Sequence, residues 1–136
     1  MWTFEITTGK FYDPSGNYVS TGYSGGDCGQ RPDGVDNPAD EGLRNVGPLP
    51  EGLYTFGEPV DHSQLGAFAI PLIPDASNDM KGRGFFYVHG DLVNGAPHSA
   101  SEGCIILSRD VRSQMWNSTD QSLQVIACRT KIGTSN

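Results

Sequence analysis

Cys104 and His89 are the residues whose types and spacing could perform covalent chemistry. Cys104 lies in the segment SEGCIIL (residues 101–107), and His89 ends the segment FFYVH (residues 85–89) fifteen positions before the cysteine. A thiol attacks a carbonyl as the thiolate, and a nearby imidazole can take its proton and stabilise the resulting charge. The pattern therefore predicts a nucleophilic cysteine with a histidine that serves first as base and then as acid for the leaving group.

The residues around this pair indicate how a substrate would be held. Gly103 leaves space for an approaching carbonyl, and the backbone N–H groups of Gly103 and Cys104 could form an oxyanion hole. Ser99 and Ser101 are candidates for orienting the imidazole or contacting substrate, and no third member of a triad is assigned. The alternative is that Cys104 is a buried strand residue and His89 a core histidine with satisfied hydrogen bonds.

Other titratable residues were weighed as bases or ligands. His98, six positions before Cys104, is the rival base, whereas His62 is expected in a surface loop. Asp91 is expected to hold the loop that follows the base, or to be a turn aspartate. The chain shows no zinc spacing such as CxxC or HExxH, so we expect no metal and no cofactor. A calcium site would be the alternative, although its candidate ligands do not match an EF-hand loop. Those candidates are Asp33, Asp36, Asp40 and Glu41.

The composition indicates one domain built from short strands. The chain has 136 residues, including 18 glycines and 9 prolines, a content that favours strands joined by turns over a helical bundle. We expect a single catalytic domain over residues 1–136, with a polar tail from about residue 130. The predicted fold class is mostly β, as a sandwich or partly closed barrel, with a short helix after the nucleophile strand.

Hydrophobic periodicity and turn residues place the elements. Strands are expected over residues 2–6, 10–12, 18–23, 53–57, 67–72, 85–89, 104–107 and 123–129. The first alternates apolar and polar residues and predicts a half-buried strand, whereas residues 85–89 have no polar face and predict burial on both sides. Pro71 predicts an edge position or an early end for its strand.

Two further segments shape the expected site. Ser108 is expected to cap a helix over residues 110–117. Residues 24–52 follow neither period, which predicts a long loop that either faces substrate or is a solvated insertion.

Charge and hydropathy exclude some classes of partner. The net charge of −7 argues against nucleic acid or an anionic membrane. No stretch has the length of a membrane span, and no secretory signal is visible at the start. Work outside the cytoplasm would therefore need another route or an upstream segment. Cys28 and Cys128 could form one disulfide, or Cys128 could be a small core residue.

The motif around the cysteine resembles that of the YkuD-type L,D-transpeptidases. Their signature is a histidine followed downstream by Ser/Thr-His-Gly-Cys and an apolar residue. The matching positions are His89, Ser101, Gly103, Cys104 and Ile105.

The chain departs from this signature at two positions. Glu102 replaces the second histidine, and Ile106 stands where an arginine often follows the cysteine. Glu102 alters the electrostatics and the substrate contact beside the thiol. Arg109 or Arg112 could supply a carboxylate-binding cation instead, the alternative being a solvated helix arginine.

A branch of this superfamily is more similar, namely the L,D-transpeptidase-like effectors of type VI secretion systems. The similarity covers about residues 9–128 and includes GYSG (22–25), GPLPEGLY (47–54), HGD (89–91) and SEGC (101–104). The resemblance implies action on peptidoglycan stem peptides or their precursors, with attack on the carbonyl before a D-amino acid. Transfer of the acyl group to water would give L,D-carboxypeptidase activity, and transfer to an amine would give transpeptidation or D-amino-acid exchange.

The same resemblance implies a place of action and partners. An antibacterial effector would be made in the cytoplasm, exported by a signal-less route through secretion machinery, and active in the periplasm of a target bacterium. A cognate immunity protein would then be a partner. Tyr23, Ser24 and Gly90, which belong to the shared motifs, are expected to border the substrate pocket.

Two other functions remain open at this point. A catalytically inactive wall-binding or interaction module on the same scaffold is favoured by Glu102, because a carboxylate beside a thiol raises the pKa of that thiol. A housekeeping or self-processing enzyme of the producing cell is the third possibility. Loss of turnover and toxicity on Cys104→Ala separates an enzyme from a binding module.

Overall fold

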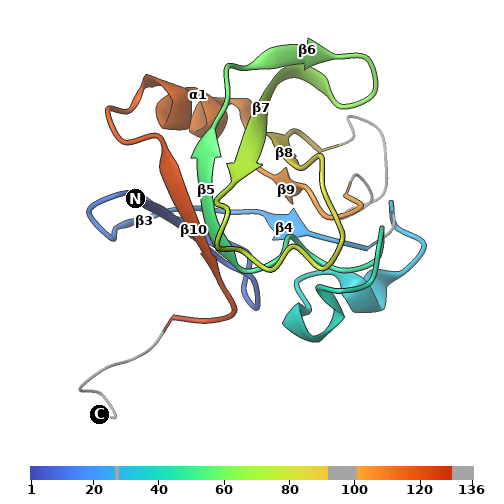
Figure 1. Ribbon diagram of the computed structural model, residues 1–136. Helices are drawn as coiled ribbons and strands as arrows, with labels where there is room; N and C mark the ends of the chain where they lie inside the picture. Colours follow the sequence, from blue (N-terminus) through green and yellow to red (C-terminus); the bar gives the residue numbers. More distant parts are fainter. Residues whose placement is uncertain (27, 92–100, 130–136) are drawn as a thin grey trace.

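The computed structural model describes residues 1–26, 28–91 and 101–129 (Figure 1). Within these residues the chain forms ten strands, one α-helix and two short 3₁₀ helices. The strands are β1 (Trp2–Glu5), β2 (Lys10–Tyr12), β3 (Tyr18–Thr21), β4 (Tyr23–Ser24), β5 (Gly52–Phe56), β6 (Val60–His62), β7 (Gly66–Pro74), β8 (Tyr87–His89), β9 (Ile105–Ile106) and β10 (Ser122–Ile126). The helices are η1 (Pro32–Gly34), η2 (Pro38–Asp40) and α1 (Arg109–Asn117). The prediction of a mostly β fold with a short helix after the cysteine is confirmed.

The strands form one mixed sheet in the order β3-β2-β1-β10-β5-β7-β8-β9-β4, with β6 added alongside β7. Two neighbouring pairs, β1 with β10 and β8 with β9, are parallel. Parallel neighbours must be joined by a crossover, so each pair brings distant parts of the sequence together. The β8–β9 pair is the one that joins the histidine segment to the cysteine segment.

The sheet curls so that its two ends approach each other without closing into a barrel. Strands β3 and β4 lie at opposite ends of the strand order, yet only Gly22 separates them in sequence. A Cβ at Gly22 would lie 1.9 Å from the Ile106 carbonyl oxygen, so only glycine fits where the chain passes between the two ends. The prediction of partial closure therefore describes the curvature, while the hydrogen-bond ladder stays open.

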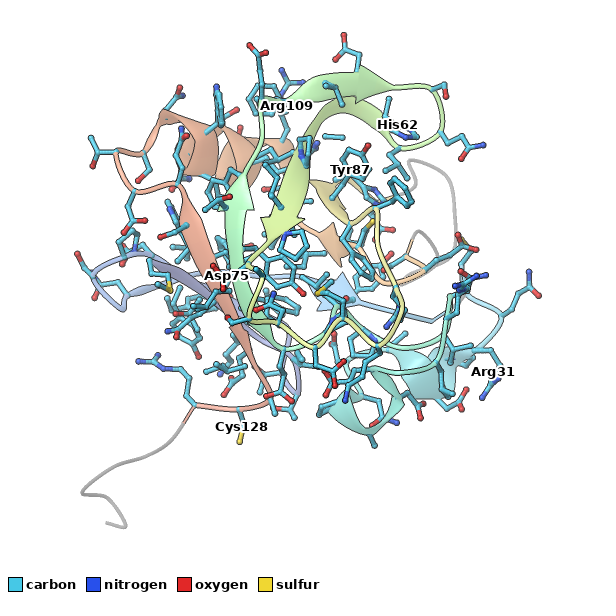
Figure 2. All side chains as sticks on the ribbon, in the orientation of Figure 1. Arg31, His62, Asp75, Tyr87, Arg109 and Cys128 are labelled. Atoms are coloured by element: carbon cyan, nitrogen blue, oxygen red, sulfur yellow. The ribbon has the colours of Figure 1, made fainter. Side chains whose placement is uncertain are left out.

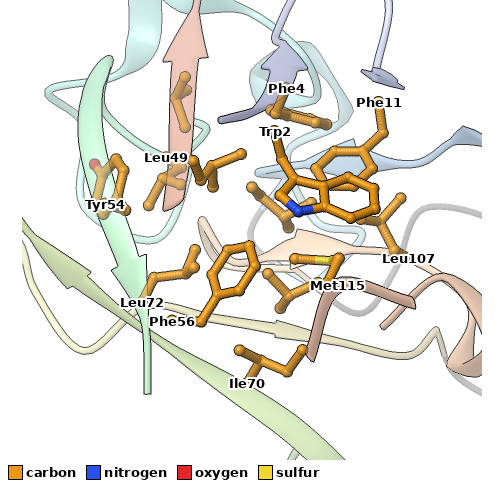
Figure 3. Packing of buried hydrophobic residues seen from close by; sticks show 14 of the residues in the cluster. Trp2, Phe4, Phe11, Leu49, Tyr54, Phe56, Ile70, Leu72, Leu107 and Met115 are labelled. Carbon is orange, nitrogen blue, oxygen red and sulfur yellow. The ribbon is translucent and has the colours of Figure 1, made fainter. Parts of the chain in front are cut away.

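The hydrophobic core lies inside this curl (Figure 3). Side chains from both halves of the strand order meet there, and the rings of Trp2 and Phe11 stack with centroids 5.3 Å apart. The largest fully buried members are Tyr54, Phe4, Phe11, Ile6, Leu49, Ile70, Ile105, Met115 and Leu123. Met115 belongs to α1, so the apolar face of the helix closes one side of the core.

Three expectations about strands were wrong. Both faces of β1 are covered, because its polar Glu5 accepts hydrogen bonds from the Thr8 hydroxyl and the Arg129 N–H instead of facing water. Strand β8 begins only at Tyr87, since Phe85 has a φ of 61° and is 97% exposed. Pro71 lies inside the nine-residue β7, at the point where the partner of β7 changes from β5 to β6. The sheet needs no backbone N–H donor at this point, so a proline is tolerated there.

Helix α1 begins as the sequence predicted. Ser108 accepts a hydrogen bond from the Val111 N–H and caps the helix, and Asp110 lies in the first turn. The helix is not long enough to span a membrane, and no other described helix is long and apolar enough to do so.

The two cysteines outside the motif are exposed. Cys28 and Cys128 form no disulfide, and Cys128 is not part of the core. Figure 2 shows Cys128 well separated from Arg31, which follows Cys28 by three residues. Both readings of Cys128 were therefore wrong, because β10 ends two residues before it and the chain leaves the sheet there.

Candidate active site

The parallel pairing of β8 and β9 sets the positions of His89 and Cys104. Val88 pairs with Ile105 and His89 with Ile106. Side chains alternate between the faces of a strand, so His89 and the position of Cys104, two residues before Ile106, fall on the same face. The base and nucleophile that the sequence proposed, fifteen residues apart, are thus brought to neighbouring strands by one register.

The Cys104 thiol lies half-buried at the start of β9. Its Sγ accepts a hydrogen bond from the Tyr87 N–H at 3.3 Å. Burial raises the pKa of the Cys104 thiol to about 11, the Glu102 carboxylate adds to the rise, and the Tyr87 N–H and the Arg83 charge oppose it. The thiol is therefore protonated at neutral pH, and it would have to lose its proton to act as a nucleophile.

The His89 imidazole is held in one tautomer. Its Nδ1 lies 2.9 Å from the Gly90 carbonyl oxygen, which can only accept a hydrogen bond, so Nδ1 carries the proton and Nε2 keeps its lone pair. Burial lowers the pKa of His89 below its usual 6.5. Because the imidazole is then neutral at physiological pH, Nε2 is ready to accept a proton. Among the described residues, the Cys104 sulfur is bonded to the Tyr87 N–H rather than to His89.

The raised thiol pKa makes a prediction for chemical modification. Alkylation of Cys104 by iodoacetamide at pH 8 is expected to be about a hundredfold slower in the folded chain than in urea, since two pKa units change the thiolate fraction by that factor. Peptide mass spectrometry would follow Cys104 separately, with the exposed Cys128 as a reference for reagent activity. Faster alkylation in the folded protein would instead reveal a thiolate–imidazolium ion pair and contradict the neutral resting state.

Two serines fix the backbone that carries the thiol. The fully buried Ser101 hydroxyl accepts from the N–H groups of Gly25 and Gly103 and donates to the Cys104 carbonyl at 2.6 Å. The fully buried Ser24 hydroxyl donates to the Gly103 carbonyl and accepts from a loop N–H, each at 2.8 Å. Both side chains therefore position the segment before the nucleophile, and the described contacts of Ser101 do not include the imidazole.

Gly103 cannot be replaced without moving its neighbours. Its φ is +132°, and a Cβ would lie 2.5 Å from the Arg83 guanidinium and 2.7 Å from the Phe86 ring. Its N–H is bonded to Ser101 at 3.0 Å, so it is not open to a substrate oxygen. Of the two N–H groups expected to form an oxyanion hole, only that of Cys104 has no acceptor among the described residues.

Arg83 is the residue that sequence reasoning missed. Its guanidinium is buried and bonds four backbone carbonyls from two separate segments. Those acceptors are Glu41, Gly47, Pro48 and Glu102. Arg83 thereby fastens the long loop to the turn before Cys104 and also places a positive charge near the thiol. The only local signal was an arginine between two glycines just before the histidine strand.

The expected carboxylate-binding arginines have other roles. Arg109, the first residue of α1, is exposed and stacks over the Phe68 ring at 4.4 Å (Figure 2). Arg112 is buried and donates to the Ala67 and Phe68 carbonyls, which fixes α1 to β7. Arg112 also explains why a glycine occupies position 90, because a Cβ at that position would lie 3.0 Å from the Arg112 guanidinium.

The other candidates occupy distinct places around the pair. The Tyr23 hydroxyl donates to the Asp91 carboxylate at 2.6 Å, which ties the segment after His89 to β4. The His62 ring packs edge-on against Tyr87 with ring centroids 5.2 Å apart (Figure 2). His62 is the last residue of β6, so the expectation that it lies in a surface loop was wrong. The rival base at position 98 and the serine at position 99 lie outside the described residues.

The described part of the chain holds no group of three or more histidine, cysteine or carboxylate side chains suited to a metal ion. Asp36, one of the calcium candidates, is half-buried and accepts a hydrogen bond from the Ser24 N–H at 3.0 Å. Burial raises the pKa of Asp36 to about 7. Its carboxylate therefore supports the loop beside Ser24.

Comparison with known proteins identifies one family. The model of the Tlde1 domain matches residues 19–130, which include β3 to β10, the histidine and the cysteine. No curated protein matches the chain.

Proposed function

The chain belongs to the Tlde1 domain family of type VI secretion effectors with an L,D-transpeptidase-like domain, and on that premise we propose that it is a cysteine-dependent enzyme acting on peptidoglycan stem peptides. The observation that carries the proposal is the β8–β9 register, which puts the cysteine on the face of a histidine whose Nε2 is unprotonated. A neutral base beside a neutral thiol is the resting state of a general-base mechanism.

The reaction begins with transfer of the Cys104 proton to His89 Nε2 as Sγ attacks the carbonyl before a D-amino acid. The developing oxyanion faces the Cys104 N–H, the donor left without an acceptor among the described residues. The C–N bond then breaks, His89 returns its proton to the leaving amine, and a thioester remains on Cys104. Water resolves the thioester in L,D-carboxypeptidation, and an amine resolves it in transpeptidation or D-amino-acid exchange.

Burial of the thiol supports an ordered reaction. Because the pKa of the Cys104 thiol is raised to about 11, few free thiolates exist before substrate binds. The thiol proton must therefore pass to His89 Nε2 while Sγ attacks a bound substrate. This requirement restricts the reaction to a bound acyl donor. The same raised pKa is also the observation that favours the alternative, a wall-binding module that performs no chemistry.

A muropeptide assay tests the proposal against this alternative. We expect tetrapeptide muropeptides incubated with the chain to lose terminal D-alanine, or to exchange it for an added D-amino acid. Intact-protein mass spectrometry should show the acyl adduct on Cys104 under acid quench, and the Cys128→Ser variant should behave identically. Unchanged muropeptides that still bind the folded chain would refute the enzyme and leave the binding module.

The family places the chain among proteins exported into target cells. Action in the periplasm of a target bacterium follows from the proposed substrate, because stem peptides and their precursors are exposed there. Depletion of donor peptides would make the enzyme toxic, and secretion machinery and a cognate immunity protein are its proposed partners.

A further inference from the structure

A hollow of about 300 Å³ lies beside the turn that leads to Cys104. It is lined by Arg44 and Asn45 of the long loop, by residues 82–86, and by Glu102. Phe86 adjoins Tyr87, whose N–H bonds the thiol sulfur, and Glu102 lies two residues before the cysteine. Two of the three segments that build the hollow are therefore adjacent to Cys104 and to the Tyr87 N–H that binds its sulfur.

Besides the buried Arg83, two exposed residues of opposite charge line this hollow without forming an ion pair with each other. Arg44 and Glu102 are both exposed, and neither belongs to an ion pair among the described residues. Arg44 makes one long hydrogen bond of 3.4 Å, to the Gly82 carbonyl, and it repels the neighbouring Arg83 guanidinium. Each charge is thus available to a ligand that carries both signs.

Phe85 adds an apolar surface at the rim of the hollow. It is 97% exposed and has a φ of 61°, a conformation that bulky residues rarely adopt. Strained backbone positions cluster at ligand-contacting sites, which makes Phe85 a candidate contact residue. Gly82, with a φ of +71°, makes the left-handed turn that precedes it.

We propose that this hollow is the subsite for the free α-amino acid in the reaction, with Arg44 binding the carboxylate, Glu102 the ammonium group and Phe85 the side chain. The inference rests on the proposed function and extends it to the leaving group and the acceptor. It also gives a role to Glu102, the residue that departs from the transpeptidase signature.

The chemistry explains why one subsite serves both directions. When the C–N bond breaks, the leaving amine takes the proton from His89, gains a second proton from water and becomes an ammonium group beside Glu102. In exchange, an incoming D-amino acid occupies the same place and gives up its extra proton to water. Its neutral amine attacks the thioester carbonyl, His89 takes one of the two amine protons, the C–S bond breaks, and His89 passes that proton to the Cys104 sulfur. Arg44 holds the carboxylate throughout, and it would equally bind the terminal carboxylate of a donor peptide.

Protein-detected NMR of ligand binding to the Cys104→Ala chain tests the subsite without turnover. NMR titrations would use D-alanine, D-alaninol, which lacks the carboxylate, and propionate, which lacks the ammonium group. We expect each analogue to bind about tenfold more weakly than D-alanine, as a charge-assisted hydrogen bond is lost. Arg44→Gln should remove the difference between D-alanine and D-alaninol, and Glu102→Gln the difference between D-alanine and propionate.

Lys81→Gln is the matched control, because it removes one positive charge from the same loop outside the hollow. It should leave all three affinities unchanged. Absence of D-alanine-dependent shifts in the residues that line the hollow, or equal effects of Lys81→Gln and Arg44→Gln, would overturn the subsite. Neither result depends on muropeptide turnover by the unmodified chain, so failure of the subsite and failure of the proposed enzyme remain distinguishable.

Discussion

Cys104→Ala is expected to abolish stem-peptide turnover, with a loss of at least about a thousandfold. The variant removes the sulfur that accepts a hydrogen bond from the Tyr87 N–H of β8, so no thioester can form. Cys104→Ser should be equally inactive, because a buried hydroxyl loses its proton even less readily than a thiol whose pKa is already raised to about 11. Release of D-alanine measured by mass spectrometry gives the rate.

A companion variant separates the nucleophile from its base. His89→Ala should cost about 10²–10⁴-fold, the usual contribution of a general base. The double variant should be no worse than Cys104→Ala, since residues that act as a unit are not additive. Cys104 packs against the core, so thermal unfolding of each variant must first show an intact fold. Residual activity of Cys104→Ala near that of the unmodified chain would eliminate the covalent mechanism.

Arg83→Met is expected to cause the largest loss of stability, about 3 kcal/mol or more in the free energy of unfolding. The substitution leaves several partly buried carbonyl groups without a donor, and each such group costs about 1–3 kcal/mol. Arg83→Lys should recover only part of the loss, because an ammonium group lacks the planar fork that reaches both segments. Urea unfolding measures the difference.

Arg31→Met is the matched control for this variant. Arg31 is exposed and paired with Asp33, so its replacement should change the free energy of unfolding by roughly 1 kcal/mol or less. Arg83→Met should also speed alkylation of Cys104, because the turn before the thiol loses its link to the long loop. Equal stability of the two variants would show that Arg83 is not the fastening residue.

The sequence proposed the chemistry of the site, because the residue types of a motif and their spacing are visible without the fold. A glycine before the cysteine and a serine three positions before it were both expected near the thiol. Their roles were not, since Ser101 binds the Gly103 N–H and the Cys104 carbonyl, and both contacts require a turn that periodicity does not describe. The Gly103 N–H, which was expected to help form the oxyanion hole, is instead donated to the Ser101 hydroxyl within the turn.

Long-range contacts explain what the sequence could not provide. Arg83 bonds carbonyls 19 to 42 residues away, and nothing in its own segment indicates those partners. The same holds for Arg109 and Arg112, which the sequence could not distinguish. Packing places Arg109 over the Phe68 ring, whereas Arg112 donates to the Ala67 and Phe68 carbonyls of β7. The hollow beside Glu102 also arises only where the long loop and the turn meet.

By itself, the sequence determined the mostly β architecture and the cap of α1, and it proposed the nucleophile and the base. These follow from local properties: side-chain periodicity, turn residues, a hydroxyl before a helix, and a thiol and an imidazole at a set spacing. Only the tertiary structure decided the tautomer of His89, the raised pKa of Cys104 and the N–H group left for an oxyanion. Each of these depends on which neighbours exclude water and which carbonyls lie within hydrogen-bond reach, and burial and reach are set by the packing of the whole sheet.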